Sequence, residues 1–230
     1  MKLTGLIAAP HTPFKADFSL NLDRVPDQAA HLAANGVTGA FVAGTTGESH
    51  SVSTPERIEI FNAWGEVARA NGVQFIAHIG HNNLPDARAL AAAAREAGAD
   101  AVSAMAPNFF KPADAAALLD WFQRIVEPAA GMPFYFYDIP GFTGVTIDTA
   151  EFVQRATEAL PGFVGVKYTN PDCEQLERIL AMDNAPDMLW GCDEKLLDGW
   201  ELGCRGAIGS SYNFSAGIYH RVMEAHAAGD

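Results

Sequence analysis

The sequence predicts an α/β protein with a single (β/α)8 TIM barrel, because eight apolar runs of strand length alternate with eight stretches of helical periodicity. Connections of helix length permit parallel strands with right-handed crossovers. Eight such units in about 250 residues can close into a barrel. Since no break in composition divides the chain of 230 residues, we expect one domain over residues 1–230.

The expected strands are the apolar runs Leu3–Ala9, Thr38–Ala43, Gln74–His78, Ala101–Met105, Pro133–Tyr137, Phe163–Lys167, Asp187–Trp190 and Gly206–Ile208. The expected helices place apolar residues three and four positions apart, often after a Ser, Thr, Asp or Asn that can cap a helix. These helices are Asn21–Ala34, Thr54–Asn71, Leu84–Ala97, Pro112–Glu127, Asp148–Ala159, Asp172–Met182, Glu194–Leu202 and Asn213–Ala228.

A doubly wound open sheet is the structural alternative, since the same alternation of strands and helices builds it. However, no glycine-rich dinucleotide fingerprint follows the first expected strand. Eight units without a break in composition also suit one closed barrel better than two half-sheets.

Composition and charge disfavour several classes of partner. Hydrophobic residues make up 49% of the chain, which is typical of a globular protein with a substantial core. The formal net charge of −13 disfavours nucleic acid and anionic lipid, because both polyanions require clustered Lys and Arg. An anionic small molecule stays possible where backbone amides and hydroxyls supply local donors.

We expect a cytoplasmic protein that does not span a membrane. The longest apolar runs are only strand-sized, and the residues after Met1 lead straight into an expected strand, unlike a signal peptide. The cysteines Cys173, Cys192 and Cys204 are too few and too scattered for a disulfide framework.

Lys167 closes the apolar run Phe163–Lys167, where a strand end would present its amine at the edge of a buried sheet. Burial weakens the preference of lysine for its ammonium form, and a neutral amine can attack a ketone to give a Schiff base. The structural alternative is a lysine that extends its amine into water. The neighbouring motifs decide between the two.

The segment Gly44–Ser49 follows the second expected strand and is rich in glycine and hydroxyl groups. Glycines let backbone amides point inward, and together with the hydroxyls of Thr45 and Thr46 they could form a nest of donors for a carboxylate. An ordinary turn whose hydroxyls cap the next helix would explain the segment equally well.

Tyr137 ends the fifth expected strand, next to the strand that carries Lys167. A phenol beside an amine can relay protons while a carbinolamine forms and a carbon–carbon bond breaks. Packing is the simpler explanation for an aromatic residue at a strand end.

Polar residues also follow the last two expected strands. Asp193, Glu194 and Ser210 could hydrogen-bond to a polyol. Alternatively, Asp193 could cap the next helix, and Glu194 could be an acidic residue that the helix dipole favours in the first turn.

These elements lie at the carboxyl ends of five expected strands, where barrels place their chemistry. Together they resemble the class I, Schiff-base aldolases of the dihydrodipicolinate synthase and N-acetylneuraminate lyase family. The matching segments are Gly44-Thr45-Thr46-Gly47-Glu48, Tyr137-Asp138-Ile139-Pro140, Gly165-Val166-Lys167, Gly191-Cys192-Asp193-Glu194 and Gly206-Ala207-Ile208-Gly209-Ser210. The resemblance runs from the first strand to Asn213 or beyond.

Within this family the chain looks most like the N-acetylneuraminate lyase branch. Synthase-like members carry an Arg two residues after the Pro of the Tyr-x-x-Pro motif, and Phe142 occupies that position in this chain. Asp193, Glu194 and Ser210 match groups with which the lyase branch holds the hydroxylated tail of a sialic acid. By the same resemblance, Thr169 and Gly191 line that pocket.

The resemblance implies an enzyme that needs no cofactor, a carbon–carbon lyase acting on a 2-keto sugar acid. Lys167 would attack the C2 ketone while Thr45 and Thr46 hold the C1 carboxylate. Tyr137 would take the C4 hydroxyl proton as the C3–C4 bond breaks, giving N-acetylmannosamine and pyruvate. Family members are oligomers, so a homo-oligomer, either a tetramer or a dimer, is expected.

Two features depart from the family pattern. Many members place a Tyr from a neighbouring subunit in the proton relay, in a segment that matches Ala106–Pro112, and in this chain Phe109 and Phe110 occupy the corresponding positions. Members also continue past the eighth barrel helix into a helical extension that helps build their tetramer. Because the sequence runs only to Asp230, this extension is expected to be absent or truncated.

Three alternatives stay open. A 2-keto-3-deoxy sugar acid such as 2-keto-3-deoxygluconate would suit the same family chemistry. A metal-dependent hydrolase could use His78 and His81, with His11 and His50 near other strand ends, although no His-x-His pair lies on the first strand. The third alternative is a barrel that binds sugar acids without catalysis.

Overall fold

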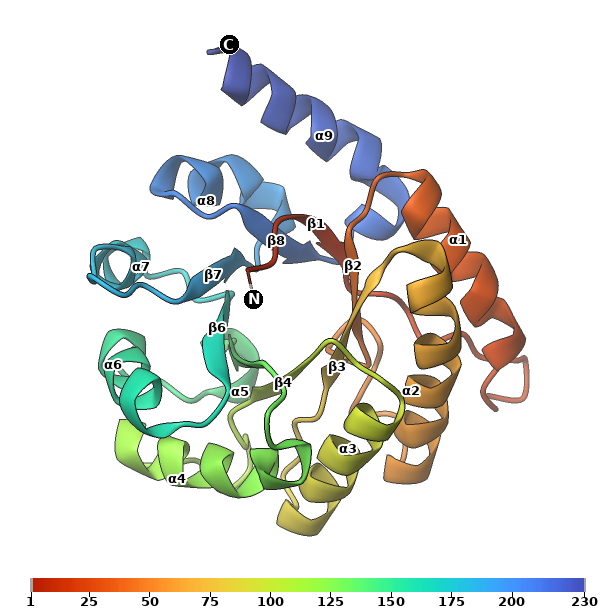
Figure 1. Cartoon of the computed structure of the whole chain (residues 1–230), viewed down its shortest axis with the longest axis horizontal. Coiled ribbons are helices and arrows are strands. Elements are labelled where there is room, and N and C mark those ends of the chain that lie inside the picture. Colours follow the sequence, from red (N-terminus) through yellow and green to blue (C-terminus); the bar gives the residue numbers. More distant parts are fainter. Residues whose placement is uncertain (1, 230) are drawn as a thin grey trace.

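The computed structural model describes residues 2–229 and shows a closed barrel of parallel strands surrounded by helices (Figure 1). The strands follow one another in chain order, and the last strand pairs with the first to close the barrel. They are β1 (Gly5–Ala8), β2 (Gly39–Val42), β3 (Gln74–His78), β4 (Ala101–Met105), β5 (Phe134–Asp138), β6 (Phe163–Tyr168), β7 (Asp187–Trp190) and β8 (Gly206–Gly209). The predicted (β/α)8 barrel is confirmed.

The barrel helices are α1 (Val25–Ala34), α2 (Thr54–Ala68), α3 (Leu84–Glu96), α4 (Ala115–Val126), α6 (Thr149–Ala159), α7 (Cys173–Leu180), α8 (Leu196–Leu202) and α9 (Tyr212–Ala228). Single 3-10 turns adjoin them: η1 (Leu22–Arg24), η2 (Arg69–Asn71), η3 (Glu127–Ala129) and η4 (Asp193–Lys195). The sequence does not predict the short helix α5 (Pro140–Thr143), because Pro140 and Gly141 together are typical of a turn.

Polar side chains fix where several helices begin. The Ser53 hydroxyl and the Glu56 carboxylate accept hydrogen bonds from each other's backbone amides, which makes a capping box at the start of α2. Four other helices have a side-chain cap, from Asn83, Asp114, Asp148 and Asp172. The cap at Asp114 explains why α4 begins at Ala115 and not at Pro112, where the apolar pattern starts.

The core has two apolar layers. Side chains from alternate strand positions, among them Ile7, Phe41 and Ile76, fill the inside of the barrel. The other layer lies between the strands and the helices and includes Trp64 and Phe122. Because every strand is covered on both faces, its residues read as an almost continuous apolar run.

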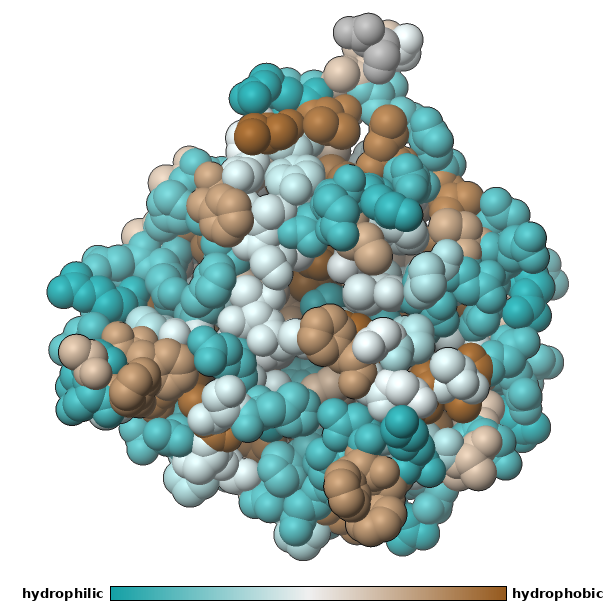
Figure 2. Space-filling view, turned by 180° about the vertical axis from the view of Figure 1, so that it is seen from behind, coloured by the Kyte–Doolittle hydropathy of each residue, from teal (hydrophilic) through white to brown (hydrophobic). Residues whose placement is uncertain are grey.

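Figure 1 looks at the end of the barrel where the N-terminus lies, and Figure 2 shows the opposite face, toward which the strands run. Small, pale side chains surround a hollow near the centre of that face (Figure 2). Helix α9 extends away from the barrel, with Phe214 and Ile218 exposed (Figure 1). Within residues 2–229, no helix has the length and apolar character needed to cross a membrane.

Candidate active site

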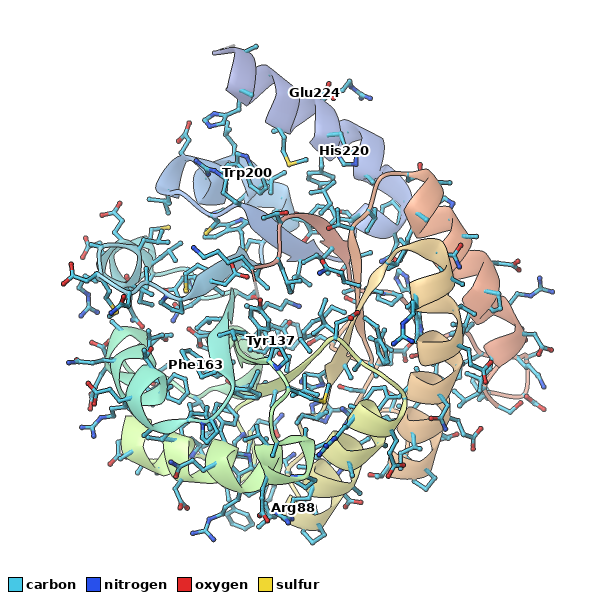
Figure 3. The ribbon with its side chains drawn as sticks, in the orientation of Figure 1. Arg88, Tyr137, Phe163, Trp200, His220 and Glu224 are labelled. Carbon is cyan, nitrogen blue, oxygen red and sulfur yellow. The ribbon has the colours of Figure 1, made fainter. Side chains whose placement is uncertain are left out.

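Lys167 lies on β6 near the carboxyl end of the barrel, and only 4% of the residue is exposed. Its Nζ lies 3.9 Å from the centroid of the Tyr137 ring. The two residues are register partners on β5 and β6, and Figure 3 shows Tyr137 inside the ring of strands. The structure thus brings together the amine and the phenol that the sequence singles out.

A second ring, that of Phe41 on β2, faces the same amine. The Lys167 Nζ lies 4.2 Å from the Phe41 ring centroid, and the Phe41 and Tyr137 rings meet edge to face with centroids 5.5 Å apart. The faces of aromatic rings attract a cation and shield it from bulk water. Alternation along β2 places Phe41 on an inward face, but it does not show that Phe41 meets a lysine from β6, because these strands are not neighbours in the barrel.

The Gly44–Gly47 turn after β2 brings two hydroxyls to the same end of the barrel. The Thr45 Oγ1 lies 3.3 Å from the Tyr137 hydroxyl, and the Thr46 Oγ1 lies 2.7 Å from the Ser210 Oγ. Thr45 therefore adjoins the Lys167–Tyr137 pair, whereas Thr46 adjoins the end of β8.

Asp193 links the ends of β7 and β8. Its Oδ2 accepts hydrogen bonds from the amide and the hydroxyl of Ser211, at 2.7 and 2.5 Å, and the Tyr219 hydroxyl lies 2.8 Å from the Ser211 Oγ. Asp193 does not cap its own 3-10 turn, and Glu194 beside it is exposed. Burial raises the pKa of the Cys192 thiol, as do both carboxylates, so this cysteine is not an activated nucleophile.

Thr169 and Gly191 meet at the ends of β6 and β7. The Thr169 Oγ1 lies 3.5 Å from the Gly191 carbonyl oxygen, and a Cβ added at Gly191 would lie 2.0 Å from that Oγ1. Only glycine fits there without displacing Thr169. Ser211 and Tyr219 have no separate signal in the sequence, because their role depends on how α9 packs against the end of β7.

Three phenylalanines lie exposed in the segments that follow β4 and β5. Phe109 and Phe110 are 76% and 85% exposed, and their rings pack edge to face with centroids 4.9 Å apart. Phe142 in α5 is 73% exposed. Among the rings of the described residues, Tyr137 supplies the phenol that lies over the Lys167 amine.

The histidines do not converge as a hydrolase site would require. His78 is fully buried, and its Nδ1 lies 3.1 Å from the Ala43 carbonyl oxygen. His81 Nδ1 accepts a hydrogen bond from the Asn83 amide. Among residues 2–229, no group of three or more His, Cys, Asp or Glu side chains is placed to hold a metal ion.

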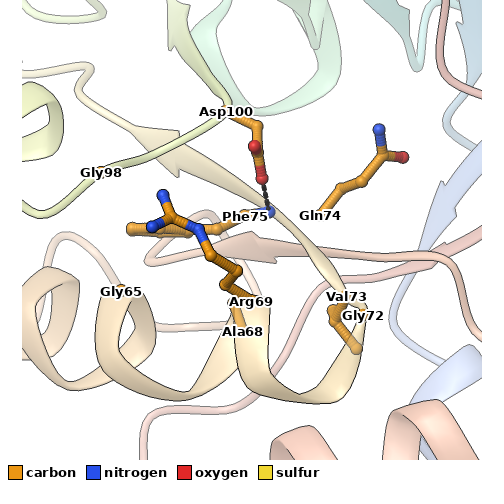
Figure 4. A pocket seen from close by; sticks show the side chains of 9 residues that line it. All are labelled: Gly65, Ala68, Arg69, Gly72, Val73, Gln74, Phe75, Gly98 and Asp100. Carbon is orange, nitrogen blue, oxygen red and sulfur yellow. Dashed lines mark hydrogen bonds between the residues drawn. The ribbon is translucent and has the colours of Figure 1, made fainter.

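A separate small pocket, of about 200 Å³, lies at the other end of the barrel (Figure 4). Arg69, Gln74 and Asp100 contribute side chains to its wall, and the Asp100 carboxylate accepts a hydrogen bond of 2.8 Å from the Phe75 amide. Gln74 begins β3, so this pocket is remote from the strand ends that carry Lys167 and Tyr137.

Comparison with known proteins shows the family of the chain. The Dihydrodipicolinate synthetase family matches residues 2–230. The chain is 35% identical over 227 residues to an N-acetylneuraminate lyase of Danio rerio, covering 97% of this chain and 74% of that one. It is 36% identical over 230 residues to N-acetylneuraminate lyase B of Xenopus laevis, covering 100% of this chain and 86% of that one.

Solved structures give the same result. The N-acetylneuraminate lyase of Proteus mirabilis superposes with a TM-score of 0.96 at 36% identity, covering 100% of this chain and 78% of that chain. The sialic acid aldolase of Aliivibrio salmonicida superposes with a TM-score of 0.96 at 35% identity, covering 100% and 76%.

Fold and matches together define the class of the protein: it is a carbon–carbon lyase of the class I aldolase type, built on a (β/α)8 barrel. The chain belongs to the Dihydrodipicolinate synthetase family.

Proposed function

We propose that the protein is a sialic acid aldolase that reversibly cleaves N-acetylneuraminate to pyruvate and N-acetylmannosamine through a Schiff base on Lys167. The observation that carries this proposal is the buried Lys167 amine, which lies against the rings of Tyr137 and Phe41 at the carboxyl end of the barrel. The N-acetylneuraminate lyases that resemble the whole chain support the choice of substrate.

In the first step, the Lys167 amine gives up its proton and adds to the C2 ketone of the open-chain sugar acid. The carbinolamine hydroxyl takes up a proton and leaves as water, which gives a protonated imine that can accept an electron pair. The hydroxyls of Thr45 and Thr46, with amides of their turn, hold the C1 carboxylate beside the reacting carbon. These donors are local, so they can act against the overall negative charge of the protein.

In the second step, the C3–C4 bond breaks. Tyr137 takes the C4 hydroxyl proton while its own phenolic proton moves toward the C1 carboxylate, and the electron pair of the bond enters the imine to give an enamine. N-Acetylmannosamine leaves as the aldehyde. Protonation of the enamine at C3 and hydrolysis of the imine then release pyruvate and restore the Lys167 amine, so the cycle needs no cofactor.

The sugar tail would lie toward β7 and β8. Asp193, Glu194 and Ser210 are the proposed partners of its hydroxyls, and Thr169 and Gly191 would form the wall between them. Asp193 is suited to this role because Ser211 already fixes one of its carboxylate oxygens, which orients the other.

A homo-oligomer in the cytoplasm is part of the same proposal. The exposed Phe109 and Phe110 form an apolar surface of the kind that favours association with a second copy of the chain. Cys173, Cys192 and Cys204 are free thiols, which suits a reducing compartment.

Product analysis tests the proposed activity. Incubation with N-acetylneuraminate should release pyruvate and N-acetylmannosamine in equal amounts, and 2-keto-3-deoxygluconate should be cleaved more slowly at equal concentration. A preference for the deoxy sugar acid would transfer the assignment to that substrate. Binding of N-acetylneuraminate without release of either product would instead identify a non-catalytic sugar-acid-binding protein.

A further inference from the structure

Arg57 on α2 is a buried cation that contacts the end of β3. Only 1% of the residue is exposed, and its guanidinium donates hydrogen bonds to the backbone carbonyls of Gly80, at 2.9 Å, and His78. Within residues 2–229 it forms no ion pair with a carboxylate. Burying an unpaired charge is costly. The hydrogen bonds to these two carbonyls offset part of that cost, so Arg57 holds the end of β3 firmly.

His78 is the residue that Arg57 holds most directly. Its Nδ1 lies 3.1 Å from the Ala43 carbonyl oxygen and 3.3 Å from the Arg57 guanidinium. Arg57 already has carbonyl acceptors, whereas the buried Ala43 carbonyl has no other donor among the hydrogen bonds of the described residues. We therefore assign the proton to Nδ1, which donates to Ala43.

Burial and the nearby cations keep this imidazole neutral. Burial lowers the pKa of His78 well below its ordinary value, and the charges of Arg57 and Lys167 lower it further. A neutral imidazole has one donor and one acceptor nitrogen. With Nδ1 protonated, His78 donates to Ala43 and to no other group.

Ala43 is a sensitive point in the backbone. Its φ of 52° lies in the left-handed region that residues with a side chain rarely adopt. The Gly44–Gly47 turn follows immediately, so the orientation of the Ala43 peptide determines where Thr45 and Thr46 lie. A hydrogen bond that fixes the Ala43 carbonyl therefore fixes the proposed carboxylate site.

The His78 ring also contacts the aromatic residues around Lys167. It packs edge to face against Tyr137, with centroids 6.0 Å apart, and tilted against Phe41, with centroids 5.8 Å apart. Gly80 makes room for the ring, because a Cβ there would lie 2.8 Å from the His78 Nε2. His78 thus touches both the donor turn and the surroundings of the amine.

We propose that His78, oriented by Arg57, is a positioning residue that holds the Gly44–Gly47 turn in the geometry that binds the substrate carboxylate. This inference rests on the proposed aldolase function. If His78 only fills space, its role depends on the ring. If His78 positions the turn, its role depends on the Nδ1–H donor. Two substitutions separate these requirements.

His78→Asn keeps a donor near the Nδ1 position but loses the ring, and His78→Phe keeps a ring but loses the donor. The readout is the pyruvate concentration at which borohydride traps half of the protein as an adduct. We expect His78→Phe to raise this concentration about tenfold or more and His78→Asn to change it less than about threefold, the effect expected for loss of a hydrogen bond to the turn. The reverse order would show that the ring only packs and would overturn the proposal.

Arg57→Met provides a second test that does not alter the histidine. It should raise half-saturating pyruvate, and its combination with His78→Phe should be no worse than His78→Phe alone, because both changes release the same bond. If the double variant instead raises half-saturating pyruvate by the product of the two separate factors, the proposal is contradicted. If the wild-type protein traps no pyruvate, the proposed aldolase function itself is overturned. If the wild type and His78→Phe trap pyruvate equally well, only the role of His78 is overturned.

Nitrogen NMR of the wild-type protein tests the assignment of the His78 proton to Nδ1 without any substitution. Protein labelled with ¹⁵N-histidine should show His78 protonated at Nδ1 and bare at Nε2 throughout the neutral pH range. An Nε2–H tautomer, or an imidazolium in that range, would overturn the proposal.

Discussion

At the scale of single residues, the candidate site depends on the contact between an amine and a phenol. The Tyr137 ring lies against the Lys167 Nζ, and its hydroxyl lies 3.3 Å from the Thr45 Oγ1. No other tyrosine of the described chain lies over this amine. Tyr137 is thus the phenol that we propose as the proton acceptor in cleavage.

Tyr137→Phe should separate cleavage from imine formation. Loss of the proton acceptor should lower kcat for cleavage by about 10²-fold to 10⁴-fold, the range for general acid–base catalysis. The variant should still form an adduct with pyruvate under borohydride, because Lys167 is intact and the ring stays in place. Cleavage at the wild-type rate would show that the phenol does not act in the reaction.

Residue types and strand ends are enough to single out Lys167, Tyr137 and Thr45 from the sequence. The alternation of strands and helices places all three at one end of the barrel. Phe41 and Arg57 are not predictable in the same way, because an apolar residue in a strand and an arginine in a helix have no distinctive pattern. Their roles appear only when strands or helices distant in the sequence meet.

At the scale of elements, one buried carboxylate joins β5, α6 and the segment that follows β6. Asp138 accepts hydrogen bonds from Thr149, at 2.8 Å, and from Asn170, at 3.1 Å. Burial raises the pKa of the Asp138 carboxyl, although both hydrogen bonds act in the opposite direction. The folded protein therefore binds this proton more tightly than the unfolded chain does. The contribution of Asp138 to stability is greatest below pH 3.8, its ordinary pKa, and is lost as the pH rises through the raised value.

Asp138→Asn should consequently stabilise the protein at neutral pH. The amide oxygen can still accept from Thr149 and Asn170, and no charge is buried. We expect the Tm at neutral pH to rise by a few degrees and the rise in Tm on acidification to become smaller. Thermal unfolding followed by circular dichroism measures both effects. A lower Tm at neutral pH would show that the negative charge itself is needed.

Gly191→Ala tests the turn between β7 and η4. The new Cβ would lie 2.0 Å from the Thr169 Oγ1 and 2.8 Å from the Tyr168 carbonyl oxygen, so the wall of the proposed sugar site must shift. We expect KM for N-acetylneuraminate to rise about tenfold, which corresponds to a loss of about 1.4 kcal/mol of binding free energy. Trapping of pyruvate, which has no sugar tail, should be unchanged. An equal loss in both assays would place the effect on the barrel and not on the tail site.

The elements themselves follow closely from local rules. Strand limits agree with the apolar runs to within two residues, and the cap at Asp172 marks the start of α7. The short 3-10 turns and α5 escape prediction, because single turns contain too few residues for a periodic signal. The contact of Tyr137 with Lys167 follows directly from the chain order of the strands, since neighbours in sequence are neighbours in the barrel.

At the scale of the whole molecule, the exposed aromatic pair Phe109–Phe110 should control assembly. Replacing both with Asp adds two charges to an apolar surface, where association would have to desolvate them. We expect the wild type to be oligomeric and the variant to shift toward the monomer in light scattering after size exclusion, with an unchanged circular dichroism spectrum. Ser53→Ala, at the cap of α2, is a matched control that should cost about 1 kcal/mol of stability without changing the mass. A monomeric wild type would contradict the proposed homo-oligomer.

Covalent imine formation between the Lys167 amine and the substrate is the central claim. Incubation with pyruvate and borohydride, followed by digestion and mass spectrometry, tests it most directly, with Lys167→Arg as the control. We expect one reduced adduct, on the peptide that contains Lys167, and none in the control. An adduct on another lysine, or no adduct while N-acetylneuraminate is still cleaved, would contradict this mechanism.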